Sequence, residues 1–497
     1  MDVQEENMNK KLCMLLALLM LASTACGDSG ASETTDESSA DNAAVETVET
    51  EETENFDPGL PAKDFGGRTF TFMTKNDESW SDWKESSIYY AELTGEVLND
   101  AVYNRNSYVQ ETYNVVLAEY APNSGNFVKE AETAVKTGDT TYDVIMPPLN
   151  NAGTLVQSGY LMNLYEVENL NLSQRWWDER SIADLSIANK LYMVSGDIST
   201  LNNDATWCTM INLEVLNNLG VETPYQYVAE DNWNFDTYKM LCENASIDLD
   251  GDGTFGKDDS IANLTQNENA TAMLITFGYH LINKDQNDIP YFDLEGNERV
   301  YDILKDYSEF MLDDRLSLNY HEKGASDGYH LLTTKMFEEN RGLFWITNLQ
   351  MVIRLREMET DFGIAPCPKY DQQQEDYCNV VWFVGSYSTV PVSALDPAES
   401  GFILEAMAAK SREILRPAYY ETALSLKYLR DEESIEMLDL VIDNRAYELE
   451  QAFNFGSTDA VNGIVLNSKE PASTFASANK SIASKIEKTL EQIGAAN

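Results

Sequence analysis

The chain has 497 residues, and its 84 aspartates and glutamates against 34 lysines and arginines give a net charge of −50. This excess of negative charge excludes nucleic acid as a partner, because phosphate binding requires a basic face. It also excludes electrostatic attachment to anionic lipid, so any attachment to a membrane has to be covalent.

The N-terminal residues have the composition of a secretory signal followed by a tether. Two lysines precede the apolar run 12–22, which is too short to span a bilayer, and small residues then lead to Cys26. This order predicts a cleavable signal over residues 1–25. Residues 26–58 are rich in Ser, Thr, Ala, Asp and Glu, and this composition predicts a disordered acidic tether.

The residues around Cys26 resemble a bacterial lipobox. Ala25 matches that pattern, whereas Ser23 stands where leucine is commoner. The resemblance implies cleavage before Cys26 and its acylation, with palmitate among the chains, which holds a protein on the extracytoplasmic face of the cell membrane. A plain cleavable signal with an incidental cysteine is the alternative, and both Met1 and Met8 remain possible start sites.

From Phe65 onward, strand and helix patterns alternate. The predicted elements are a strand over 68–74, a helix over 99–113, a strand over 115–120, a helix over 127–135, a strand over 142–146 and a helix over 152–157. This alternation predicts a parallel α/β sheet. Ligands bind such sheets at the carboxyl ends of the strands, so we expect the loops after Thr74 and Met146 to line a site.

The rest of the chain adds further α/β elements. We expect strands over 206–212, 342–346 and 361–365, helices over 213–221, 235–245 and 300–312, and mostly helix from Glu399. About 440 residues remain after the signal and tether, which is enough for two lobes rather than one.

Several of these segments resemble a known family in their order and spacing. They are YDVIMPPLNNAGTLVQSGYLMNL (142–164), RGLFWITNLQ (341–350), DFGIAPCPKY (361–370) and VVWFVGSYSTVPVSA (380–394). The family is that of the extracellular solute-binding proteins that includes the maltose-binding protein. The resemblance implies an α/β, two-lobed periplasmic-binding-protein-like fold with hinge crossing strands, which closes on its ligand.

Carried over to this chain, lobe one covers residues 59–203 plus 367–395. Lobe two covers 204–363 plus 399–497. The function implied is the solute-binding component of an ABC importer, a monomer that binds a sugar between the lobes and delivers it to permease subunits. The size of the sugar stays open.

Sugar binding requires flat aromatic surfaces and planar polar groups. The resemblance implies that Asn150 and Asn151 reach the ligand and that the strand 342–346 delivers Trp345, the best candidate aromatic; Pro147 and Pro148 replace an aromatic common in the family. The full set of ligand-binding candidates is Trp80, Trp83, Asn150, Asn151, Trp207, Trp345, Asn348, Trp382 and Arg416. Packing within the folded chain is the competing interpretation for the tryptophans and for Arg416.

The segment DLDGDGTFGKDD (248–259) has the spacing of a calcium-binding loop. Asp248, Asp250 and Asp252 occupy positions 1, 3 and 5, Thr254 offers its carbonyl at position 7, and Asp259 closes the loop at position 12. An aspartate at position 12 departs from the usual glutamate, as in dockerin-like loops. We predict a structural Ca²⁺, and the alternative is an acidic turn without metal.

No motif for nucleophilic, phosphate-loop or metal catalysis occurs in the sequence, and its three histidines have no metal-ligand spacing. We therefore expect no enzyme. A surface glycosidase, or an adhesion lipoprotein that binds polysaccharide or peptide, is the alternative. Cys367 and Cys378 either form a disulfide or, with Cys208 and Cys242, stay free thiols.

Overall fold

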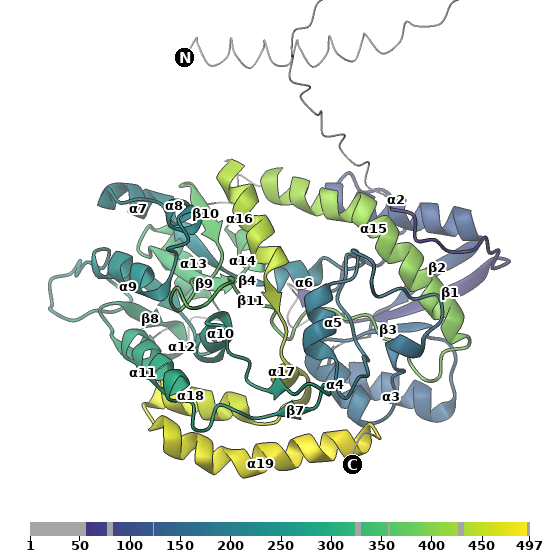
Figure 1. Cartoon of the computed structure of the whole chain (residues 1–497). Coiled ribbons are helices and arrows are strands. Elements are labelled where there is room, and N and C mark those ends of the chain that lie inside the picture. The colour runs from purple at the N-terminus through teal and green to yellow at the C-terminus, as the bar shows by residue number, and fades with distance from the viewer. Residues whose placement is uncertain are drawn as a thin grey trace, which may run out of the picture. The chain divides into compact units, whose positions relative to one another are not determined.

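Residues 56–76, 83–122, 124–323, 330–355, 358–425 and 432–494 are described by a computed structural model of the chain (Figure 1). The predicted signal, Cys26, most of the tether and Trp80 lie outside these ranges. Within them, no helix combines the length and the apolar composition needed to cross a bilayer.

Lobe one is built on a three-stranded parallel sheet in the order β2-β1-β3. Its strands are β1 (Arg68–Thr74), β2 (Val115–Tyr120) and β3 (Val144–Met146), and they alternate with α2 (Val97–Tyr113), α3 (Phe127–Thr137) and α4 (Leu149–Gln157). The alternating apolar pattern of β1 buries Phe70 and Phe72 completely, as a central strand requires. The strand–helix alternation predicted for this part of the chain is confirmed.

Lobe two is built on a five-stranded mixed sheet in the order β10-β4-β9-β5-β8. Its strands are β4 (Trp207–Asn212), β5 (Asn263–Thr265), β8 (Ser317–Asn319), β9 (Phe344–Asn348) and β10 (Phe362–Ala365). Helices α9 (Phe235–Glu243) and α11 (Glu298–Leu312) are capped by Asn234 and Asn297, whose side chains accept hydrogen bonds from backbone N–H groups of the first turn. In the core, the Phe344 ring packs against Tyr238 and Trp233, with centroids 4.8 and 5.7 Å away.

The remaining elements connect and cover the two sheets. Up to residue 276 they are η3 (Ser124–Asn126), η4 (Leu164–Glu166), α5 (Glu179–Leu185), α6 (Leu201–Asp204), α7 (Leu213–Leu219), α8 (Pro224–Ala229) and α10 (Asn269–Thr276). After it come β6 (Asn283–Lys284), β7 (Pro290–Tyr291), α12 (Tyr320–Lys323), α13 (Leu331–Glu338), α14 (Gln350–Arg354), β11 (Asn379–Val380), α15 (Pro397–Ser425), α16 (Glu432–Asp443), β12 (Arg445–Ala446), α17 (Leu449–Phe453), α18 (Ser457–Asn467) and α19 (Pro471–Gln492).

The chain passes between the lobes in segments that hydrogen-bond to one another, and we call this region the crossing. Trp382 N donates to Ala205 O at 2.9 Å, and Val381 N donates to Ala446 O at 2.9 Å. Strands β11 and β12 pair in parallel beside these bonds. The expected hinge of crossing strands is therefore present in the fold.

The C-terminal helices do not all belong to lobe two, so the predicted boundary is wrong there. Helix α15 lies along α2 of lobe one (Figure 1), and α17 packs on α4. The reason is long-range packing, because apolar side chains of α15 such as Phe402 and Met407 enter the core of lobe one. Conversely, Cys367 and Val380 pack in the core of lobe two, so the chain returns to lobe one only at Val381.

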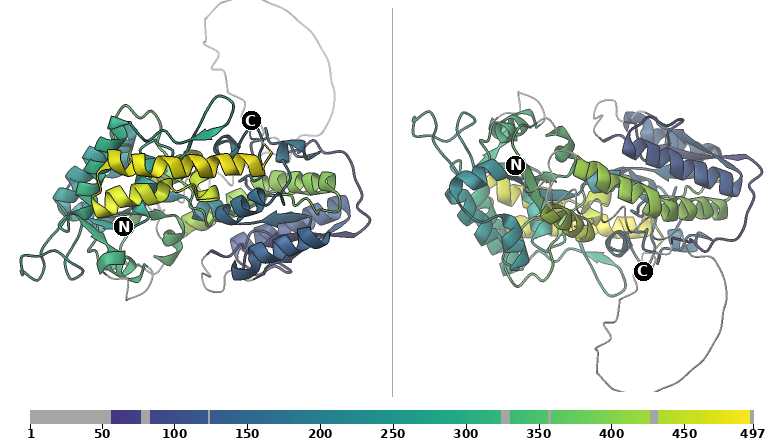
Figure 2. Two further views of the ribbon diagram at one scale, coloured as in Figure 1. Left: turned by 90° about the horizontal axis from the view of Figure 1, so that it is seen from below. Right: turned by 90° about the horizontal axis from the view of Figure 1, so that it is seen from above.

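Two further elements contact both lobes. Helix α19 is the long yellow helix that ends at the C-terminus in the left view of Figure 2. It places Phe475 in the core of lobe two and Ile482 and Ile486 in that of lobe one. The β6–β7 hairpin leaves lobe two and reaches Ser186 of lobe one, whose hydroxyl oxygen accepts a hydrogen bond from Lys284 Nζ at 2.8 Å.

The contact between α4 and α17 depends on Gly153. A Cβ atom at this position would lie 1.9 Å from the carbonyl oxygen of Ala452, which is backbone and cannot rotate away. Only glycine allows the two helices to approach this closely.

We therefore expect Gly153→Val to lower the free energy of unfolding by about 2–3 kcal/mol, because the α4–α17 contact has to open. Urea denaturation followed by circular dichroism measures this change. The matched control is Gly125→Ala, since a Cβ there has no atom within 4 Å. Equal stability of the two variants would contradict the packing described.

Candidate functional site

The carboxyl ends of both sheets are tied to the crossing. On the side of lobe one, Leu149 N, just after β3, donates to Phe383 O at 2.8 Å. On the side of lobe two, Leu349 N, just after β9, donates to Thr206 O at 2.9 Å. The loops in which an α/β sheet binds its ligand therefore meet at one place.

Aromatic rings gather at this meeting point. Trp207 is fully buried, whereas Trp382 and Phe383 are half-buried. The Trp382 ring centroid lies 5.5 Å from that of Trp207 and 5.5 Å from that of Phe383. Trp382 packs against the hydrophobic cores of both lobes, so it is an aromatic side chain at the lobe boundary.

Buried polar atoms without hydrogen-bond partners occur at the end of β9 and on Trp207. They are Oδ1 of Asn348, the last residue of β9, Oε1 of Gln350, two residues later, and Nε1 of Trp207, whose backbone pairs with that of Asn348 where β4 meets β9. None of these atoms has a partner among the residues that the structure describes. A buried polar atom without a partner costs about 1–3 kcal/mol, so such a set favours a polar ligand.

We call Trp207, Asn348, Gln350, Trp382 and Phe383 the junction residues. Three of them, Trp207, Asn348 and Trp382, were predicted from the sequence as ligand-binding candidates, and the structure brings them together. Sequence reasoning missed Gln350 and gave Phe383 no role. Their positions in the sequence could have indicated both residues, because each stands within two residues of a predicted candidate.

The other predicted candidates lie in different places. Asn150 and Asn151 begin α4 directly after the bond from Leu149 to Phe383; Asn150 is exposed and Asn151 is half-buried. Trp83 is buried in the core of lobe one. Trp345 is fully buried in lobe two, with ring centroids 5.6 Å from His330 and 6.1 Å from Phe337. The structure therefore places Trp382, and not Trp345, at the lobe boundary.

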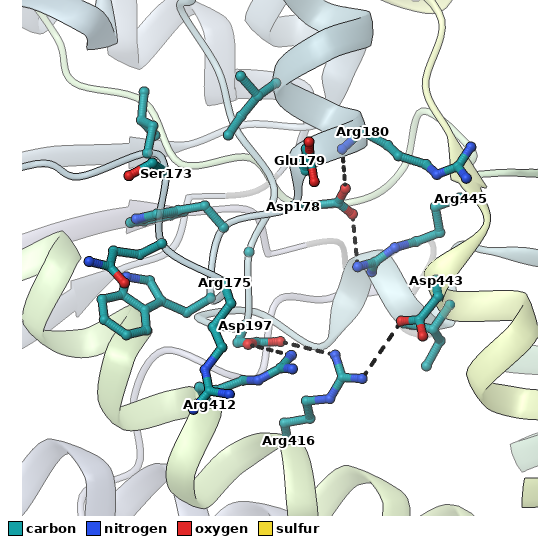
Figure 3. A pocket seen from close by; sticks show the side chains of 17 residues that line it. Ser173, Arg175, Asp178, Glu179, Arg180, Asp197, Arg412, Arg416, Asp443 and Arg445 are labelled. Carbon is teal, nitrogen blue, oxygen red and sulfur yellow. Dashed lines mark hydrogen bonds and ion pairs between the residues drawn. The ribbon is translucent and has the colours of Figure 1, made fainter. Parts of the chain in front are cut away.

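Arg416 lies on α15, apart from the junction. It lines a cavity of about 760 Å³ bounded by α15, the segment 172–182 and the end of α16 (Figure 3). None of the junction residues belongs to the lining of this cavity. The structure therefore does not bring Arg416 together with the other candidates.

Two acidic side chains near the strand ends have raised pKa values. Burial raises the pKa of Glu119 to about 7, although Thr74 Oγ1 donates a hydrogen bond to its carboxylate at 2.6 Å. Burial likewise raises the pKa of Asp204 to about 7, against a 3.0 Å hydrogen bond from the Tyr419 hydroxyl. Sequence reasoning missed both, although a carboxylate next to the end of an apolar strand was a visible signal.

A histidine–glutamate pair ties lobe two to the crossing. His280 Nδ1 lies 2.8 Å from Glu448 Oε1, and Leu281 N donates to the same oxygen. Burial lowers the pKa of His280, but the carboxylates of Glu448 and Asp184 outweigh it and raise that pKa to about 9. Glu448 thus joins the His280 side chain to the backbone of Leu281 and holds the loop after α10 against the crossing.

The predicted calcium loop brings three carboxylates together. Oxygens of Asp248, Asp250 and Asp252 lie within 4.8 Å of one another, and Gly253 has the positive φ of +83° that the sharp turn requires. Asp259 is not part of this group. Its carboxylate instead accepts hydrogen bonds from Leu249 N and Gly256 N at 2.9 and 2.8 Å, which close the loop.

Thr254, the fifth predicted ligand, is also used within the loop. Its backbone N–H and its hydroxyl both donate to Asp252 Oδ1, at 2.7 and 2.6 Å, and these bonds lower the pKa of Asp252. Its carbonyl remains the group assigned to the metal. The calcium site stays a prediction.

The four described cysteines are free thiols. Cys208, Cys242 and Cys367 are buried, and Cys378 is half-buried. Of the two alternatives left open by the sequence, the structure therefore contains the free thiols and no bond between Cys367 and Cys378.

Comparison with known proteins identifies the fold. No protein-family model and no curated protein sequence matches the chain. Among solved structures, a cyclic alpha-maltosyl-1,6-maltose binding protein from Arthrobacter globiformis has a TM-score of 0.57 at 11% identity, covering 85% of this chain and 99% of that one. UspC from Mycobacterium tuberculosis has a TM-score of 0.55 at 11% identity, covering 84% and 100%.

The maltose/maltodextrin-binding domain MalE from Bdellovibrio bacteriovorus, bound to maltotriose, is a third similar structure. Its TM-score is 0.51 at 12% identity, covering 84% of this chain and 99% of that one. The likeness spans nearly the whole of each of these proteins. The chain therefore has the two-lobed fold of the maltose-binding-protein-like solute-binding proteins, as the resemblance in its sequence implied.

Proposed function

We propose that this chain is the solute-binding component of an ABC importer. It binds a carbohydrate at the junction, delivers it to the permease subunits, and catalyses no reaction. The fold supports this proposal, and so do the solved structures with the same fold, which are named as binding proteins for maltose, maltodextrins and related sugars.

The observation that carries the proposal is the chemistry of the junction residues. Trp382 offers an aromatic ring at the boundary of the two lobes and lies 5.5 Å from the ring of Trp207, which pairs with Asn348. The amide oxygens of Asn348 and of Gln350, two residues later, have no partner among the described residues. A sugar presents C–H faces to such a ring and hydroxyl groups to such amides. Binding would thus satisfy polar atoms that are otherwise buried without a partner.

A glycosidase is the rival function, since half-buried carboxylates such as Glu119 lie near the strand ends. It requires two carboxyl groups at a fixed separation across the sugar ring. A binding protein gains stability from its ligand by mass action and releases no product. A single incubation with sugar, followed for stabilisation and for released product, therefore distinguishes the two functions.

We expect a maltooligosaccharide series, from maltose to maltotetraose, to raise the melting temperature of the wild-type protein without releasing shorter sugars. Trp382→Ala should weaken sugar binding by at least about tenfold, or about 1.4 kcal/mol, because the stacking surface is lost. Isothermal titration calorimetry measures the affinity, and chromatography of the incubated sugar measures turnover.

Tyr165→Ala is the matched control, since it removes an exposed aromatic ring that lies outside the junction residues. It should bind sugar as the wild type does. Release of shorter sugars would overturn the binding-protein function in favour of the glycosidase. Unchanged affinity in Trp382→Ala would overturn the assignment of the site.

We further propose that acylated Cys26 anchors the protein to the outer face of the membrane. The lipobox-like residues before Cys26 and the acidic segment after it support this attachment. In cells, the wild-type protein should fractionate with membranes and incorporate labelled palmitate. Cys26→Ser should lose the label, and a Cys13→Ser control should keep it. A labelled Cys26→Ser protein would exclude this anchor.

The calcium loop is proposed to hold one structural Ca²⁺ through Asp248, Asp250, Asp252 and the Thr254 carbonyl. Calorimetry on chelator-stripped protein should show binding at millimolar or lower Ca²⁺. Asp252→Asn should weaken it at least about tenfold by removing one charged ligand. The adjacent Asp258→Asn is the control, since Asp258 is outside the carboxylate group. No heat of binding in the wild type would exclude the site.

A further inference from the structure

The cavity beside the crossing collects positive charge in a strongly acidic chain. Five of the thirteen arginines of the sequence line it, namely Arg175, Arg180, Arg412, Arg416 and Arg445. Its lining holds four acidic residues, namely Asp178, Glu179, Asp197 and Asp443. The cavity therefore carries one excess positive charge, whereas the whole chain carries −50.

Two of the four acidic residues of this cavity, Asp178 and Asp197, are already engaged. Asp178 Oδ1 caps the first turn of α5, and its Oδ2 accepts hydrogen bonds from the Tyr447 hydroxyl at 2.6 Å and lies 2.8 Å from Arg445 Nη2. Asp197 is shared, because Arg412 approaches it at 3.3 Å and Arg416 at 3.8 Å (Figure 3). Burial raises the pKa of Asp197, and the neighbouring arginines oppose this shift.

The guanidinium of Arg416 retains donors for another partner. Its distances to Asp197 and Asp443, 3.8 and 3.9 Å, are longer than hydrogen bonds. Among the described residues its one hydrogen bond runs from Nη2 to the Tyr420 hydroxyl at 3.3 Å. A guanidinium has five N–H donors, so most of those of Arg416 have no acceptor in this part of the chain.

Arg445, on the crossing, contributes an independent observation. Its Nη1 donates to Asn203 at 2.8 Å and its Nη2 pairs with Asp178, but its buried Nε has no partner among the residues described. An unpaired buried donor on a charged group is costly, and an oxyanion is the acceptor that guanidinium forks fit best.

We propose that this cavity binds a small oxyanion, a carboxylate or phosphate group carried by a solute, through Arg412 and Arg416 of α15 and Arg445 of the crossing. The planar fork of arginine accepts such groups in two parallel hydrogen bonds. The site is separate from the junction, since the two share no lining residue. Because α15 packs on lobe one, the bound anion joins this helix to the crossing.

Calorimetry with inorganic phosphate and with D-glucuronate tests this site, at constant ionic strength set with sodium chloride. D-glucose serves as the uncharged counterpart of glucuronate. We expect saturable one-to-one binding of at least one of the two anions, and which of them binds more tightly identifies the source of the oxyanion. Glucose should not compete with the bound anion.

Arg416→Gln should weaken anion binding at least tenfold. Arg416→Lys keeps the charge but loses the planar fork, so it should bind more weakly than the wild type and serves if the glutamine variant does not fold. Arg315→Gln is the matched control, since Arg315 is exposed on lobe two and its loss changes the net charge equally. Its anion affinity should equal that of the wild type.

Absence of saturable binding by both anions at tens of millimolar would overturn the proposal. So would equal weakening by Arg416→Gln and Arg315→Gln, which would show a general charge effect. These outcomes are distinguishable from failure at the junction, because neutral maltooligosaccharides and Trp382→Ala report on that site alone.

Discussion

The backbone hydrogen bonds of the crossing fix the positions on which the rest of the site depends. The hydrogen bond from Trp382 N to Ala205 O joins two of the segments that cross between the lobes. The hydrogen bonds from Leu149 N and Leu349 N attach the end of each sheet to these segments. Because these bonds use main-chain atoms, the side chain of Trp382 is left to pack against both cores. The junction residues therefore meet where the two lobes meet, and a ligand there contacts both.

Most local structure could be predicted because its signals are local. The strand 68–74 and the helix from 99 to 113 follow from the period of their apolar residues, and the structure has them within two residues. The allocation of α15 to lobe one could not be predicted in this way. Its packing against α2 joins residues about 300 positions apart, and apolar periodicity does not specify the partner.

The candidate site was predictable only in part, for a related reason. Trp345 and Trp382 both stand on apolar strands near polar residues, and the sequence does not show which ring faces a core. The structure distinguishes the two tryptophans. Trp345 lies on β9, which is flanked by β4 and β5 in the core of lobe two, whereas Trp382 follows the short β11 at the lobe boundary. Likewise, the arginines of the second cavity are brought together from positions 175 to 445 by the fold alone. The acidic loop 248–259 is contiguous, so its carboxylate group was visible in the sequence.

We propose that a carbohydrate binds at the junction and is not cleaved. A crystal structure of the protein with the maltooligosaccharide that raises its melting temperature most tests this claim directly. We expect an intact sugar with one ring against the Trp382 side chain and hydroxyl groups within hydrogen-bond distance of Asn348 and Gln350. A sugar bound elsewhere on the protein, or a cleaved product at the junction, would contradict it.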